Sequence, residues 1–275
     1  IGKALGVSRV LEGSLRRVGD QLRVTAQLIN VADGYQLWSE RYDRQMVDIF
    51  SIQDEIAQAI AARIAGKTSD DSLELDPRVF TDNLEAYELY LKGKHCWARA
   101  GEYFVKGIEY TDRARQLDPE FAQAHAWYAI MQVYLVFFGY AKGSDCASRA
   151  ADAANMAMEI DENLPESHIA FGIVRQYFFF DWTATEKHYE KARELLPGDA
   201  ITAAWTAVYL TRFPDRYEEC LTYARQAVNI DPLSADHNAI LAWILWNSGS
   251  YTESLAVLEN IQEMHPLYPL GYAFA

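Results

Sequence analysis

The sequence predicts a mainly α-helical protein, an array of helical hairpins with a small amino-terminal α/β subdomain. Two observations carry this prediction: helix-closing corners recur at a nearly fixed step after Leu84, and apolar residues alternate before about residue 45. Half of the 275 residues are apolar, so the chain can bury real cores. We expect an α/β domain over 1–66, a polar linker over 67–83 and the helical array over 84–275.

The first part of the chain predicts a three-stranded antiparallel meander. Apolar residues alternate with polar ones over 9–18 and 21–30, which indicates two strands. Gly19-Asp20 between them is typical of a tight hairpin, and a second turn at 32–34 leads into a third strand over 35–42.

Helices are predicted on both sides of this meander. Residues 1–5 followed by Gly6 are typical of the last turn of a helix closed by glycine. Isoleucines at three- and four-residue spacing predict a helix over 48–65.

Five sequence blocks in this region carry a family resemblance: Leu5-Gly6-Val7, Val10 to Ser14, Arg23 to Ile29, Leu37 to Asp43, and Asp48 to Ala57. In this order they resemble the second half of the TolB-like amino-terminal domain of bacterial class III adenylate cyclases and winged-helix regulators. In that family the domain precedes tetratricopeptide repeats. The resemblance implies that an earlier strand and helix belong to the domain, so we expect it to be amino-terminally truncated, and it implies no catalytic residues.

Internal repeats organise the rest of the chain. Corner motifs stand at Asp118-Pro119, Asp161-Glu162, Leu196-Pro197, Asp231-Pro232 and His265-Pro266, with steps of 43, 35, 35 and 34 residues. The tetratricopeptide (TPR) period is about 34 residues. Small residues recur five positions before the corners, at Ala114, Ala157, Ala192 and Ala227, and ten positions after them, at Ala129, Gly172, Ala207 and Ala242.

This pattern predicts about five repeats in a TPR-type right-handed α–α superhelix, because small residues let paired helices approach closely. The 43-residue step predicts an insertion near 139–144. Residues 267–275 look like the start of a sixth unit, whose apolar side chains predict self-association through an open end of the array.

Charge narrows the range of partners. Residues 1–65 hold eight basic and eight acidic side chains, so the rest of the chain carries the whole net charge of −14. Such a surface repels nucleic acid and anionic membranes, and we expect this segment to contact neither. The most apolar windows are about a dozen residues long, whereas a membrane span needs roughly 18 to 20.

No constellation of residues indicates an enzyme. Cys96, Cys146 and Cys220 are far apart in the sequence, and the six histidines show no metal-ligand spacing. Ala65 to Thr68 resembles the end of a phosphate-binding loop, but Ala61 stands where its first glycine belongs. We therefore expect no catalytic residues, no metal and no cofactor.

The sharper functional hypothesis concerns the groove of the array. In TPR arrays the first helix of each repeat lines the concave surface, and the corners place six residues on or near that face: Trp205, Tyr209, Arg212, Trp243, Trp246 and Asn247. Tryptophan, tyrosine and arginine dominate interaction hot spots, although packing between repeats explains each position about as well. The aromatic run from Tyr177 to Trp182 is interpreted as helix packing.

The leading hypothesis is a non-catalytic regulatory and scaffolding region of a bacterial signalling protein that binds a protein or peptide in its groove. One alternative is a small-molecule sensing module. Another is an accessory region of an adenylate cyclase whose catalytic domain lies outside this sequence. We expect a cytoplasmic location, or a periplasmic one if a transmembrane helix stands upstream.

Overall fold

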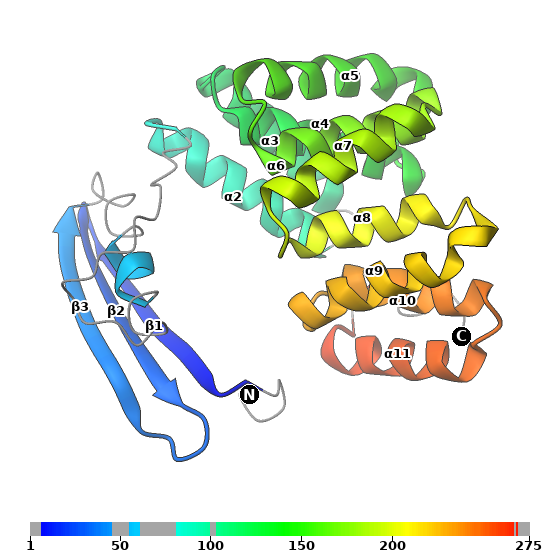
Figure 1. The fold of residues 1–275 in the computed structure, drawn as a ribbon. Coiled ribbons are helices and arrows are strands. Elements are labelled where there is room, and N and C mark those ends of the chain that lie inside the picture. Colours follow the sequence, from blue (N-terminus) through cyan, green and yellow to red (C-terminus); the bar gives the residue numbers. More distant parts are fainter. Residues whose placement is uncertain (1–6, 46–54, 61–80, 100–102, 267, 269–275) are drawn as a thin grey trace. The chain divides into compact units, whose positions relative to one another are not determined.

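The computed structural model describes residues 7–45, 55–60, 81–99, 103–266 and 268. The chain forms two compact units, Ile1–Val79 and Phe80–Ala275. The first unit contains the three strands and the second contains the helices from α2 (Leu84–Arg99) onward (Figure 1).

The first unit contains the predicted meander. Strands β1 (Arg9–Val18), β2 (Gln21–Asn30) and β3 (Gln36–Gln45) form one antiparallel sheet in the order β1-β2-β3. Gly19 has a φ of +60°, a left-handed conformation that favours glycine, and it allows the tight turn between β1 and β2. The three predicted strands are confirmed, and the third extends three residues further than expected.

One face of this sheet is covered over β2 and β3. Leu28 stands opposite Trp38 and both are buried, and Ile56 and Ile60 from a helical segment at 55–60 pack against this face. Leu15 of β1 is 64% exposed. The remainder of the helix predicted over 48–65, and the whole helix predicted over 1–5, lie outside the described residues.

The second unit consists of five helical hairpins in the described part of the chain (cyan to red in Figure 1). The pairs are α2 (Leu84–Arg99) with α3 (Tyr103–Leu117), α4 (Ala122–Phe137) with α5 (Gly143–Ile160), α6 (Pro165–Val174) with α7 (Trp182–Leu195), α8 (Ala200–Leu210) with α9 (Tyr217–Ile230), and α10 (Ala235–Asn247) with α11 (Tyr251–Met264). A π-helix, η2 (Arg175–Phe179), continues α6, and a 3-10 turn, η3 (Pro214–Arg216), precedes α9.

The predicted corners have one repeated backbone geometry. At each of the first four corners the residue that ends the helix donates its N–H to the carbonyl of an alanine four residues earlier: Ala114, Ala157, Ala192 and Ala227. These alanines are almost fully buried, as are Ala129, Ala207 and Ala242 ten positions after the corners. The small side chains let the helices of a pair pack closely, which is the role predicted for them.

Residues at the end of the predicted linker take part in the first hairpin. The Asn83 side chain accepts a hydrogen bond from the Ala86 N–H and so caps α2, while the buried Thr81 hydroxyl donates to Asp118. Residues 67–80 of the linker lie outside the described residues, as do 267 and 269–275, where the open end was predicted.

The second repeat has longer helices than the fourth. Helices α4 and α5 have 16 and 18 residues, whereas α8 and α9 have 11 and 14. The connection between α4 and α5 is residues 138–142, so the extra residues predicted near 139–144 extend the helices on both sides of this turn and do not form a longer loop. The extra residues lengthen the two helices because the apolar pattern of 129–138 continues without a breaker until Gly139, whose φ is +76°.

Substitution of Gly172 by alanine tests the close approach within the third hairpin. A Cβ atom at Gly172 would lie 2.5 Å from the ring of Tyr189, which is buried and donates its hydroxyl hydrogen to Gln176. We expect Gly172→Ala to lower the free energy of unfolding by about 1–3 kcal/mol in urea denaturation, despite the better helix propensity of alanine. Gly198→Ala is the matched control, because a Cβ there meets nothing within 4 Å. Equal stability of the two variants would contradict this account.

Candidate functional site: an aromatic pocket on the inner face of the array

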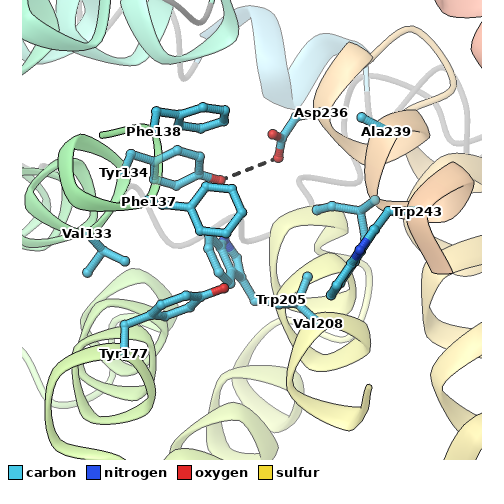
Figure 2. Close-up of a pocket in the computed structure, with 11 residues that line it drawn as sticks. Val133, Tyr134, Phe137, Phe138, Tyr177, Trp205, Val208, Asp236, Ala239 and Trp243 are labelled. Atoms are coloured by element: carbon cyan, nitrogen blue, oxygen red, sulfur yellow. Dashed lines mark hydrogen bonds between the residues drawn. The ribbon is translucent and has the colours of Figure 1, made fainter. Parts of the chain in front are cut away.

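A cavity in the helical unit lies where helices of four repeats converge. Its volume is about 150 Å³, which is the size of a cavity that holds one benzene-sized group. Side chains from α4, η2, α8 and α10 point toward one another around it (Figure 2). The lining residues are Val133, Tyr134, Phe137, Phe138, Tyr177, Trp205, Val208, Asp236, Ala239, Ile240 and Trp243.

Two irregularities in the helices place these residues around the cavity. The lengthened α4 carries Val133 to Phe138 on its last turn and carboxyl-terminal cap. The π-helix η2 widens the backbone so that Tyr177 lines the cavity, while neighbouring Gln176 points into the hairpin and accepts a hydrogen bond from Tyr189. Phe180 closes η2 in a left-handed conformation with a φ of +54°. Single π-helical turns are frequent at functional sites.

Aromatic rings form most of the pocket wall. The Trp205 ring meets Tyr134 and Tyr177 edge to face, with centroids 5.6 Å and 5.8 Å apart. These contacts hold the rings at the bottom of the pocket, where Trp205 is only 6% exposed. Phe137 and Trp243 are 60% and 36% exposed and form an accessible rim. The pocket therefore combines a fixed floor with open apolar edges.

Asp236 is the only charged side chain among the described residues that line the pocket. Its carboxylate accepts hydrogen bonds from the hydroxyls of Tyr268 at 3.0 Å and Tyr134 at 3.4 Å (Figure 2 shows the second). Protein surrounds the Asp236 side chain on all sides. It is nevertheless only half-buried, because part of its surface faces the cavity. Burial raises the pKa of Asp236 above its ordinary value, against the opposing effects of His237, Tyr268 and Tyr134.

The structure brings together two of the six residues predicted for the groove. Trp205 and Trp243 both line the pocket. The other four lie outside its lining and make other contacts: Tyr209 donates to Glu186, Arg212 stacks over Trp182, Trp246 packs against Tyr251, and Asn247 donates to the Trp243 carbonyl.

Sequence reasoning missed five lining residues that dominate the chemistry of the pocket: Tyr134, Phe137, Phe138, Tyr177 and Asp236. Tyr177 was interpreted as packing between helices of one repeat, but its ring packs against Trp205 of the next repeat and also lines the cavity. The length of α4 could have indicated Tyr134, Phe137 and Phe138 from the sequence, because a longer first helix extends further along the inner face.

His125 and His168 each hydrogen-bond the backbone of the corner that precedes them. The Nε2–H groups of His125 and His168 donate to the carbonyls of Pro119 and Glu162, each six residues earlier. Asn238 makes the equivalent bond to Pro232 in the fifth repeat. Because an amide replaces the imidazole at the same repeat position, this role is structural.

His168 also makes a second contact that fixes its protonation state. In the neutral ring, with the Nε2–H used at the corner, Nδ1 is the acceptor, and the Nδ1–H of His188 donates to it at 2.9 Å. Burial lowers the pKa of His168, and burial together with the neighbouring His168 lowers the pKa of His188 to about 4. Both rings are therefore held neutral.

Within the described residues there is no group of three or more His, Cys, Asp or Glu side chains placed to hold a metal ion. Cys96, Cys146 and Cys220 are all buried and unbridged. No described helix combines the length and the apolar character that a membrane span requires.

Comparison with known proteins shows the fold of the helical unit. No protein-family model matches the sequence. The structure is similar to the crystal structure of a thermophilic TPR protein from Thermus thermophilus, with a TM-score of 0.52 and 13% identity, over 66% of this chain and 92% of that one. The chain is thus a TPR-type right-handed α–α superhelix with a small three-stranded α/β subdomain, as the sequence predicts.

One relative of this sequence comes from Rhizobium meliloti. The chain is 31% identical over 177 residues to a Rhizobium meliloti (strain 1021) protein named "Putative adenylate cyclase 3". The match covers 63% of this chain and 30% of the relative, so this chain spans less than a third of that protein's length.

Replacement of Asp236 by asparagine tests whether the pocket carboxylate costs stability. A folded-state pKa above the unfolded value means that the folded state binds the extra proton, so stability is full below about pH 3.9 and falls as pH rises through the folded pKa. We expect Asp236→Asn to melt at a higher temperature than the parent at pH 7.5, with the difference shrinking toward pH 4 in calorimetry. A variant that melts lower throughout would show that the carboxylate stabilises the fold.

The histidine pair predicts a loss of stability in mild acid. Lowered folded pKa values mean that the stability from these rings is full above about pH 6.5 and is lost as pH falls toward 4. We expect the free energy of unfolding, measured in urea between pH 7.5 and 4.5, to depend less on pH in His188→Gln. His95→Gln, at an exposed histidine, is the matched control for the substitution itself. An unchanged slope in His188→Gln would refute the assignment.

Proposed function

We propose that this chain is a non-catalytic regulatory and scaffolding region of a bacterial signalling protein, which binds a protein or peptide partner in the groove of its TPR array. The observation that carries the proposal is the aromatic pocket on the inner face of the array. The TPR fold supports it, because the first helices of successive repeats there form one continuous concave surface.

The pocket has the features of an interaction hot spot. Hot spots place tryptophan, tyrosine or arginine in desolvated pockets near the centre of an interface. Trp205 and Tyr134 form such a floor, and the partly exposed Trp243 and Phe137 form the rim that a bound segment would cover. We propose that Trp205 and Trp243 contact the partner directly.

The relative suggests the setting of this interaction. We infer that the array regulates or recruits partners for an adenylate cyclase-type protein, in which all catalysis belongs to a separate domain. The order of the two units, sheet before helical array, supports the further proposal that the first unit is the second half of a TolB-like domain.

Selection of binding peptides tests the proposed function. A phage library of random twelve-residue peptides is selected on the immobilised chain, and enriched peptides are synthesised and titrated by calorimetry. We expect Trp243→Ala to weaken their binding at least tenfold, because it removes one wall of the pocket.

Trp246→Ala is the matched control, since Trp246 is also on α10 but packs on Tyr251 outside the pocket. Circular dichroism melts establish that both variants fold. Binding that is equally strong in the folded Trp243→Ala variant would contradict the pocket as the partner site, and failure to enrich any peptide would count against partner binding itself. Stabilisation by a metabolite in thermal-shift screening, without peptide binding, would favour the small-molecule alternative.

A further inference from the structure

The pocket combines a wall of aromatic rings with one carboxylate inside it. We propose that it takes the side chain of a lysine from the partner segment, with the ammonium group against Asp236 and the methylene stem along the rings. This inference rests on the proposed function and specifies its partner chemistry.

The chemistry of the lining favours a cation. Ring faces attract cations, with the strongest effect in sites removed from solvent. The Asp236 carboxylate receives two tyrosine hydrogens and has about four acceptor positions, so it can accept further hydrogen bonds from an ammonium group. An anion in the same place would face the negative carboxylate and the negative ring faces. A neutral apolar group would leave the carboxylate desolvated without compensation.

The size and the donor pattern favour lysine over arginine. The cavity of about 150 Å³ fits one slender chain with a compact head group. A guanidinium group presents five donors in a rigid plane, whereas Asp236 is the only charged acceptor among the described lining residues and already serves two tyrosines. The three donors of an ammonium group are easier to satisfy there and at the open rim.

The charge of the whole array is complementary to such a partner. From residue 66 onward the chain has 31 acidic and 17 basic side chains, and no lysine or arginine follows Arg225. This field attracts a basic segment and speeds its association. Asp236 then provides one specific contact within a negative electrostatic potential that attracts basic segments in general.

Free probes test the chemistry of the pocket separately from the partner. The full chain is titrated with n-butylammonium chloride and with n-butanol at constant ionic strength, and binding is followed by tryptophan fluorescence. We expect n-butylammonium to bind at least fivefold more tightly than n-butanol, and Asp236→Asn to abolish this preference. Asp152→Asn, at an exposed carboxylate on α5, should retain it. No preference in the parent chain, or an equal preference in Asp236→Asn, would overturn the proposal.

Peptides selected on the chain test the lysine itself. In a peptide that binds through the pocket, one lysine is replaced by norleucine, which keeps the stem and removes the ammonium group. We expect this change to weaken binding at least tenfold to the parent chain and less than threefold to Asp236→Asn. Peptides that need Trp243 but contain no essential lysine, including those anchored by arginine, would overturn this inference and leave the proposed function standing. Binding of n-butylammonium without any peptide binding would overturn both, and would identify a site for free amines.

Discussion

Close approach between the two helices of each hairpin is the constraint on which the rest of the array depends. It requires small residues at two positions of a repeat, and alanine or glycine occupies both in the second, third and fourth repeats. Where the residue is Gly172, the ring of Tyr189 fills the space that a Cβ would occupy. This close contact between helices recurs about every 35 residues. Successive hairpins are therefore related by nearly the same small rotation, and the array curves. That curl brings α10 back to α4.

The pocket arises where this regularity is relaxed. A strictly periodic array would give α4 the length of α8, and the last turn that carries Phe137 would be missing. A regular α-helix in place of η2 would turn Tyr177 to another side. The second and third repeats therefore keep the packing positions of the array while adding surface to its inner face. Helix length and one π-turn change the groove without changing the fold.

The parts of the structure that repeat locally could be predicted from the sequence, and the parts that depend on long-range curvature could not. Alternation predicted the strands, and the corners predicted the helix pairs, because both patterns are read over a few residues. Trp205 and Trp243, two of the residues predicted for the groove, line the cavity and stand on first helices. The contact between Tyr134 and Asp236 joins residues 102 apart, and its existence depends on the accumulated rotation of three hairpins. No local signal marks it.

Asp236 shows how the pocket differs from an ordinary core. A core position gains stability from apolar packing, whereas this carboxylate is enclosed by rings, and its burial raises its pKa. Its two tyrosine donors offset part of the desolvation cost without supplying a positive charge. A neutral side chain of similar size would fill the same space at a smaller desolvation cost. A carboxylate enclosed without a positive charge beside it fits the proposed role of Asp236, in which a lysine of the partner supplies that charge.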